Sequence, residues 1–260
     1  MFLDSSPTPL DLNFRLGHYP VRVSVWFWVG MAFCGSFSFN DPLLGPAGMA
    51  VWLACGFLSI LFHELGHAAT ARAFGVPARI SLIAFGGYAE YTRGAPPSGW
   101  RRLLVVLAGP AVNFLIVALL VVSNLSADWA HRHPVLLTGF GYLFLQNLAW
   151  GILNLFPVWP MDGGQALREV LYIVGVRRPD PATHATSAVV GGMLALLGLA
   201  VLLRVDLPFL DWLPFIPGPL MMVFFGLLAF QNWQLLQQYN QTRAGWDTTD
   251  DDERRWRGYR

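Results

Sequence analysis

Residues 63–67 read HELGH, within the apolar stretch AVWLACGFLSILFHELGHAATARAF of residues 50–74. Two imidazoles and a carboxylate are costly to bury in hydrocarbon, so a membrane-type segment that carries them indicates a functional site. Because His63 and His67 are four residues apart, a helix would project both from one face, close enough to bind one Zn²⁺. Glu64 could then act as general base toward water at the metal. The alternative is a pair of satisfied core histidines beside a buried Glu64, but the desolvation of that carboxylate makes a site without a metal costly.

The composition is that of a membrane protein. The chain of 260 residues is 55% hydrophobic and 13% charged, and its apolar residues come in long blocks. A bilayer core of roughly 30 Å needs about 20 apolar residues per helix. The first block could be mistaken for a secretory signal, but it is long and lacks a small-residue cleavage site, which favours a helix that stays. We predict an all-α polytopic membrane protein with about six transmembrane helices, at residues 21–39, 47–74, 103–122, 135–156, 183–203 and 215–236.

The basic residues indicate the orientation of the chain. All 17 of them are Arg. If the N-terminus is cytoplasmic, nearly all fall in cytoplasmic segments, and only Arg132 and Arg204 fall outside. We therefore expect a multi-pass protein of the cell membrane with its N- and C-termini in the cytoplasm. The net charge of +1 gives no reason to expect nucleic acid as a partner.

The chain is expected to form one domain, at residues 1–240, because no connection between the helices is long enough to fold alone. Its longest cytoplasmic connection carries β-type residues around a Gly86-Gly87 turn signal and predicts a hairpin at about residues 79–91. The N-terminal FRLGHYPVRVSVWF is also strand-like and could pair with the hairpin, giving a small β-sheet at the membrane surface near the site. Residues 241–260 are rich in charge and predict a disordered cytoplasmic tail.

A tetrahedral zinc ion held by two histidines needs a further protein ligand. Asp162, in NLFPVWPMDGG, approaches the membrane from the same side as HELGH, because the helices predicted at 47–74 and 135–156 run in the same direction. The histidines would lie about 7 to 14 Å below the cytoplasmic interface, and Pro157 and Pro160 should break the preceding helix at similar depth. We predict Asp162 as the third ligand. The alternative is an N-cap of a following short helix, and both roles are compatible.

Asparagines in the next two helices are further candidates. Asn113 would lie about 16 Å deep, near the metal layer, where its amide could donate to a developing oxyanion or a substrate carbonyl. A plain interhelical hydrogen bond is the alternative. Asn154 either holds the bent end of its helix or lines the cleft, whereas Gln146 and Asn147 are interpreted as helix-packing groups. The other histidines are expected at the surface or the membrane interface: His18, His131, His133 and His184.

Three elements together resemble the site-2 protease family of intramembrane zinc metalloproteases: HELGH, then GPAVN of residues 109–113, then NLFPVWPMDGG of residues 154–164. HYPVRVSVWF and FGGYAEY are also similar, so the likeness covers roughly residues 13–175. The resemblance implies His63, His67 and Asp162 as zinc ligands and Glu64 as the catalytic base, in agreement with the residue-based interpretation. Because no space is left for a PDZ module between the core helices, the six-helix pattern resembles the spore- and archaeal-type subgroup.

The expected activity is zinc-dependent cleavage of peptide bonds within or near the transmembrane segment of single-span regulatory membrane proteins. Glu64 would take a proton from the attacking water and pass it to the leaving amine, and Asn113 would assist catalysis. A substrate helix must unwind first, and an edge strand of the hairpin could capture the extended segment by strand addition. Gly86 and Gly87 in the hairpin, together with Asn154, are the candidate substrate-binding residues.

Two other functions compete with this hypothesis. A membrane-anchored protease with a soluble catalytic domain would carry its third ligand in a long hydrophilic segment, which the sequence lacks. A zinc-binding membrane protein without hydrolysis, such as a transporter or an inert relative, would spread its ligands through the membrane or lose Glu64. The expected partners are the lipid bilayer and a transmembrane substrate, and a regulatory membrane partner or a second copy of the chain is left open.

Overall fold

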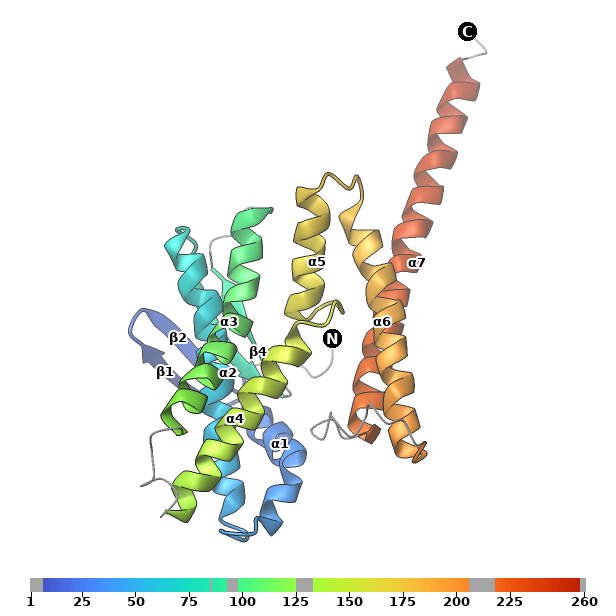
Figure 1. Ribbon diagram of the computed structural model, residues 1–260. Helices are drawn as coiled ribbons and strands as arrows, with labels where there is room; N and C mark the ends of the chain where they lie inside the picture. The colour runs from blue at the N-terminus through green and yellow to red at the C-terminus, as the bar shows by residue number, and fades with distance from the viewer. Residues whose placement is uncertain (1–6, 85, 93–97, 125–132, 206–217, 258–260) are drawn as a thin grey trace. The chain divides into compact units, whose positions relative to one another are not determined.

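The computed structural model describes residues 7–84, 86–92, 98–124, 133–205 and 218–257 (Figure 1). The chain divides into two compact units, Met1–Leu155 and Phe156–Arg260. The first unit contains β1 (Leu12–Leu16), β2 (Tyr19–Val23), α1 (Val25–Cys34), the 3-10 helix η1 (Ser36–Asn40), α2 (Gly48–Ala73), β3 (Ala78–Ile83), β4 (Gly86–Tyr91), α3 (Trp100–Asn124) and α4 (Pro134–Asn154). The second contains α5 (Asp162–Ile173), α6 (Pro179–Leu202) and α7 (Gly218–Arg257).

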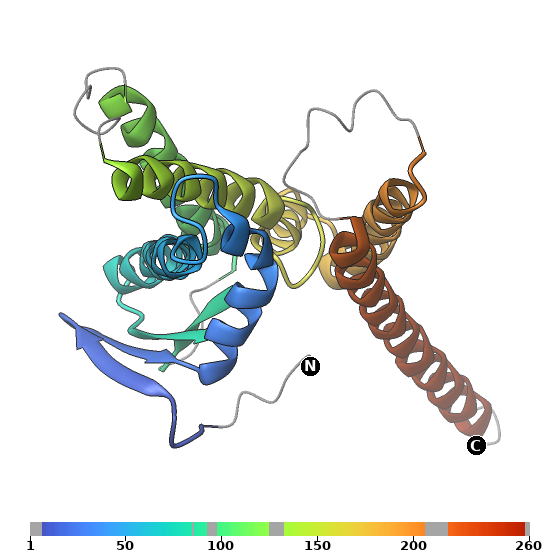
Figure 2. The same cartoon turned by 90° about the horizontal axis from the view of Figure 1, so that it is seen from below.

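Helix α2 is the centre of the first unit. It contacts α3 and α4, which also contact each other, and it packs against β3 and β4 (Figures 1 and 2). Thirteen of its residues are buried, and they are distributed along the whole helix rather than along one stripe. A helix that is covered on several sides holds its side chains in fixed positions, so α2 is suited to carry a precise site.

The sheet has the order β1-β2-β3-β4. Strands β1 and β2 form an antiparallel hairpin, β2 pairs in parallel with β3, and β3 pairs with β4 in an antiparallel hairpin. The expected hairpin and its pairing with the N-terminal segment are therefore present. Gly86 and Gly87 differ from the expectation: they are the first residues of β4 and pair with Ile83 and Leu82, so they lie beyond the turn.

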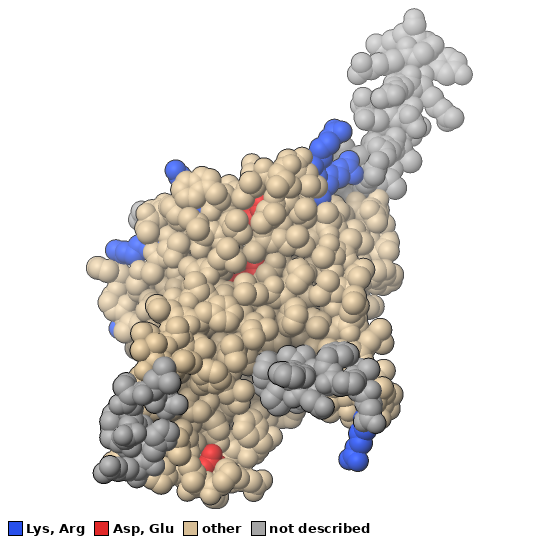
Figure 3. Space-filling model, viewed as in Figure 1, with Lys and Arg blue, Asp and Glu red and all other residues tan. Residues whose placement is uncertain are grey.

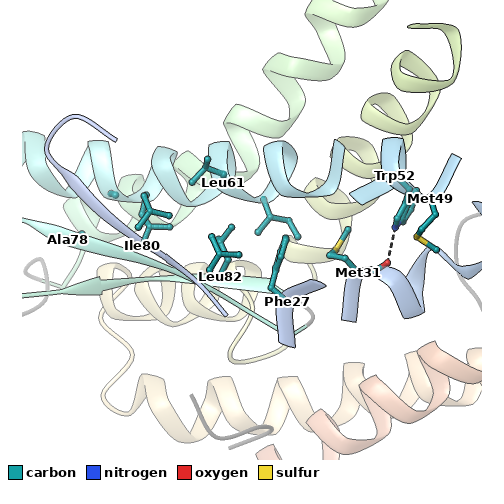
Figure 4. Close-up of a cluster of buried hydrophobic side chains, with 12 residues drawn as sticks. Phe27, Met31, Met49, Trp52, Leu61, Ala78, Ile80 and Leu82 are labelled. Atoms are coloured by element: carbon teal, nitrogen blue, oxygen red, sulfur yellow. Dashed lines mark hydrogen bonds between the residues drawn. The ribbon is translucent and has the colours of Figure 1, made fainter. Parts of the chain in front are cut away.

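The core of the first unit joins the sheet to α1 and α2 (Figure 4). Alternate residues of β2 and β3 face it, as a half-buried strand requires. Trp52 lies at one end of this core and donates its indole N–H to the Met31 carbonyl at 2.9 Å, which satisfies the buried donor. The fully covered residues of the cluster include Val23, Phe27, Ile80 and Leu82, each 0% exposed.

The helix expected at residues 21–39 is shorter than predicted. Residues 19–23 form β2, Ser24 caps the ten-residue α1, and Gly35 ends it before η1. Ten residues of helix span about 15 Å, too little to cross a bilayer core. The apolar block therefore resembled one long helix because a half-buried strand and a short apolar helix follow each other with few polar residues between them.

Five of the described helices are long and apolar enough to cross a membrane. They correspond to the other five predicted helices. The face drawn in Figure 3 has few charged side chains and a broad uncharged surface, as apolar helices in a membrane require. The fold class, a mostly helical multi-pass membrane protein with a small sheet, is confirmed. In the second unit, α6 packs against α7 and α5 packs against α6.

The tail expected to be disordered is largely helical, because α7 continues to Arg257. Residues 258–260 lie outside the described part of the chain. Extending an existing helix adds residues without a new nucleation step, so a charge-rich segment can remain helical after an apolar one. Composition alone did not reveal this continuity.

Gly66 in α2 and Gly192 in α6 are helical glycines in tight and in open surroundings, respectively. A Cβ on Gly66 would lie 2.7 Å from the Ala108 carbonyl oxygen of α3, whereas Gly192 has no neighbour within 4 Å. Small residues at such crossings let membrane helices approach closely.

Gly66→Ala should lower the midpoint of thermal unfolding in detergent, since overpacking costs about 1–3 kcal/mol. Gly192→Ala is the matched control and should be neutral or stabilising, because replacing a helical glycine gains about 0.5–1 kcal/mol. An unchanged midpoint for Gly66→Ala would contradict the close approach of α2 and α3.

Candidate metal centre and active site

Helix α2 brings the three polar side chains of HELGH into the interior of the first unit. His63 is 2% exposed, Glu64 3% and His67 7%. The two imidazole rings lie edge to face with their centroids 4.7 Å apart, as residues one turn apart on a helix permit. The predicted pairing of the histidines is therefore present inside an apolar bundle.

Helix α3 fixes both rings through their Nδ1 atoms. His67 Nδ1 lies 2.8 Å from the Val105 carbonyl oxygen, and His63 Nδ1 lies 2.5 Å from Asn113 Oδ1. Both oxygens can only accept, so each ring carries its proton on Nδ1. In the neutral imidazole this tautomer leaves Nε2 without a proton, and that is the form in which histidine binds a metal.

The two Nε2 atoms face each other at 3.1 Å. An N–H···N hydrogen bond at this place would require a ring with a proton on Nε2, against the contacts of both Nδ1 atoms. Two nitrogens bound to zinc at their usual distances in a tetrahedron lie about 3.3 Å apart. The donor atoms, their tautomers and their separation therefore fit two ligands of one zinc ion.

Gly109 of α3 makes room for this pair. A Cβ on Gly109 would lie 2.3 Å from His67 Nε2 and 2.8 Å from His63 Cε1. Any side chain here would collide with the metal-facing edge of the rings. Gly109 therefore leaves the space that the two rings occupy, and it is the first residue of the GPAVN motif, although the sequence did not single it out.

A buried polar network continues behind His63. Asn113 donates from Nδ2 to Asn147 Oδ1 at 2.8 Å, and Asn147 donates to Ser59 Oγ at 2.9 Å. Ser59 in turn donates to the Cys55 carbonyl at 2.8 Å. These contacts suit a positioning role for Asn113, and its expected contact with an oxyanion stays a prediction. Asn147 and Ser59 were not expected here, although Ser59 precedes His63 by one helical turn.

Glu64 lies beside the edge strand β4. A Cβ on Gly87 would lie 2.8 Å from Glu64 Cγ and 2.9 Å from its Oε1, so the backbone of β4 passes directly over the carboxylate. A Cβ on the neighbouring Gly86 would lie 3.2 Å from the Trp150 ring. Gly87 therefore lets β4 approach the proposed general base, and Gly86 lets it approach the Trp150 ring.

Asn154 and Asp162 lie at the ends of two helices. Asn154 is the last residue of α4 and donates to the Trp150 carbonyl at 3.0 Å, one turn earlier. This contact matches a role in holding the helix end, and substrate binding by Asn154 stays a prediction. Asp162 is the first residue of α5, and the N-cap is Met161, so the N-cap alternative for Asp162 is wrong.

Residues 52–131 and 130–198 match the model of peptidase family M50. The chain belongs to this family. It is 40% identical over 117 residues to a zinc metalloprotease of Methanocaldococcus jannaschii, covering 44% of this chain and 32% of the relative. It is 34% identical over 117 residues to stage IV sporulation protein FB of Bacillus subtilis, covering 44% of this chain and 38% of the relative. The chain thus spans only about a third of these curated relatives.

A solved structure has the same fold. The site-2 protease from Methanocaldococcus jannaschii superposes with a TM-score of 0.53 at 23% identity, over 85% of this chain and 94% of that chain. The resemblance to the site-2 protease family, inferred from HELGH, GPAVN and the Asp-Gly-Gly motif, is confirmed. The matched region of the family model includes all three motifs.

Asn113→Leu should weaken zinc binding by about 10–100-fold, because His63 loses the acceptor that fixes its ring. Asn113→Asp keeps an acceptor for His63 and should retain most of the affinity. Chelator competition on the purified protein measures both.

The control is Gln146→Leu, which removes a buried amide that donates to the Trp52 carbonyl, away from the histidines. Zinc affinity that Asn113→Leu leaves unchanged would contradict the positioning role. An affinity loss for Asn113→Asp as large as that for Asn113→Leu would do the same.

Proposed function

We propose that the chain is an intramembrane zinc-dependent endopeptidase. It cleaves peptide bonds within or near the transmembrane segments of single-span regulatory membrane proteins. The observation that carries the proposal is the pair of His Nε2 atoms 3.1 Å apart, with both Nδ1 protons engaged and Glu64 adjacent. Membership of peptidase family M50 and the apolar helices around the pair support it.

His63 and His67 would hold the zinc ion, with Asp162 as the third protein ligand. A carboxylate and two imidazoles are a usual ligand set for catalytic zinc, which keeps one position open. The position of Asp162 at the start of α5, within the region matched by the family model, supports its assignment. When bound, zinc polarises the substrate carbonyl and lowers the pKa of water.

Glu64 would act as the general base and then as the general acid. It takes a proton from the water that attacks the carbonyl carbon and delivers that proton to the amine of the departing peptide. Glu64 is 3% exposed and lies against the backbone of β4 at Gly87, so the proposed base faces the interior of the first unit. Asn113 holds His63 in place, and an additional contact with the developing oxyanion is part of the same hypothesis.

Strand β4 would receive the substrate. It is the edge strand of the sheet, and an extended peptide can add to such an edge through main-chain hydrogen bonds. Because Gly87 brings β4 against Glu64, a peptide on this edge would run close to the general base. Gly86, Gly87 and Asn154 are the proposed substrate-binding residues. The substrate segment must be unwound there, since a helix hides its carbonyl groups in its own hydrogen bonds.

The protein would act inside the cell membrane with both termini in the cytoplasm, as the distribution of Arg indicates. Its partners would be the bilayer and the membrane protein that it cleaves, together with a regulatory partner or a second copy of the chain. Against the non-hydrolytic alternative stands Glu64, which a zinc carrier does not need.

Glu64→Gln should leave zinc bound and abolish cleavage, because the amide has the shape of the carboxylate but cannot accept the proton. The test is co-expression with candidate single-span membrane proteins, and the readout is loss of a substrate's membrane anchor. Zinc content and the thermal midpoint of the variant serve as controls for folding. Cleavage by Glu64→Gln at the wild-type rate would refute the role of the base.

A further inference from the structure

The segment between α4 and α5 carries the proposed zinc ligand but has little regular structure of its own. It runs from Leu155 to Met161, and Val158 within it is 0% exposed. Irregular backbone in an apolar environment is stable only where its N–H and C=O groups find partners. The partners of this segment within the second unit therefore indicate what holds Asp162 in place.

The Trp159 peptide groups are held by two polar side chains from α6 and α7. The Trp159 N–H donates to Ser187 Oγ of α6 at 2.9 Å, and the Trp159 carbonyl accepts from Asn232 Nδ2 of α7 at 2.7 Å. Ser187 and Asn232 are each 0% exposed. Both backbone groups of one loop residue are thus satisfied by buried side chains of two other helices.

His184 fixes the orientation of Asn232. Asn232 Nδ2 uses its two hydrogens on the Trp159 and Leu228 carbonyls, so its Oδ1 is an acceptor for His184 Nδ1 at 2.8 Å. The His184 ring also lies against the Trp159 ring, with centroids 5.9 Å apart. His184, expected at the surface or the membrane interface, is buried at 7% exposure as part of this arrangement.

The first turn of α5 rests directly on the same peptide. A Cβ on Gly164 would lie 2.4 Å from the Trp159 nitrogen and 2.6 Å from the Val158 carbonyl carbon. The Met161 N–H donates to the Val158 carbonyl at 2.9 Å, and Gln165 Nε2 donates to the Pro160 carbonyl at 3.1 Å. A shift of the Trp159 peptide would therefore move the start of α5, and Asp162 with it.

We propose that His184, Ser187 and Asn232, here called the α6–α7 clamp, are positioning residues for Asp162. The proposal rests on the proposed function, in which Asp162 binds zinc. The clamp lies outside the three motifs of the family, on the last two helices of the chain. In this account α6 and α7 do more than anchor the protein, because their buried polar groups set the position of a metal ligand.

The competing explanation is that these polar groups only join α6 to α7, as hydrogen bonds commonly do between membrane helices. A purely structural role would lower thermal stability and leave zinc affinity unchanged in the folded protein. A positioning role would lower zinc affinity through Asp162. The two roles therefore differ in a readout that does not depend on catalysis.

The test is zinc affinity by chelator competition on the purified full chain in detergent, with the thermal midpoint measured alongside. Ser187→Ala and Asn232→Leu should each weaken binding by about tenfold or more. Ser187→Thr keeps the hydroxyl and should restore affinity. Thr186→Val is the matched control, because the Thr186 hydroxyl donates within α6 to the Ala182 carbonyl.

Asp162→Ala separates the clamp from the proposed function. It should weaken zinc binding, and adding Asn232→Leu to it should weaken binding no further, because both act through the same ligand. If Asp162→Ala binds zinc like the wild type, the ligand assignment is wrong and the clamp has nothing to position. If Asp162→Ala binds zinc weakly while folded Ser187→Ala binds zinc like the wild type, the positioning role of the α6–α7 clamp is refuted. The assignment of Asp162 as a zinc ligand then stands. Ser187→Ala removes only one oxygen atom, so it is the milder change. If Asn232→Leu fails to fold, the zinc affinity of Ser187→Ala alone tests the positioning role.

Discussion

His63 and His67 place two unprotonated ring nitrogens 3.1 Å apart in the interior of a helical bundle. Such a pair is unfavourable without a cation between the nitrogens. It persists only where an acceptor at Nδ1 fixes the orientation of each ring. Val105 and Asn113 of α3 supply the acceptors, and Gly109 supplies the space. These contacts need α2 and α3 close together, and Gly66 against the Ala108 carbonyl allows that approach.

Buried polar groups recur in both units, and each set stabilises a piece of the proposed centre. In the first unit, Asn113, Asn147 and Ser59 continue inward from His63. In the second unit, Ser187 and Asn232 hold the Trp159 peptide ahead of Asp162. Water is scarce in such an interior, so a buried polar side chain must form its hydrogen bonds with protein groups. If only one arrangement allows those hydrogen bonds, the side chain holds its neighbours in that arrangement.

The histidine pair and most of the membrane helices could be predicted from the sequence, because both depend on local patterns along the chain. The helical spacing of His63 and His67 places them on one face wherever the helix lies, and long apolar blocks reveal five of the membrane helices. The short first helix was missed because hydropathy does not distinguish a buried strand followed by a short helix from one long span. The roles of Asn147, Ser187 and Asn232 depend on contacts between residues far apart in the chain, and no local pattern encodes those contacts. The burial of His184 could not be predicted for the same reason.

X-ray absorption at the zinc edge of the purified protein tests the central assignment most directly. The proposed centre should hold one zinc ion per chain with two imidazole nitrogens at about 2.0–2.1 Å and oxygen as the remaining ligand type. In His63→Ala the spectrum of any zinc that remains should show one imidazole fewer. A protein purified without zinc that fails to bind it on addition would contradict the account, and so would a spectrum with sulfur ligands or without paired imidazoles.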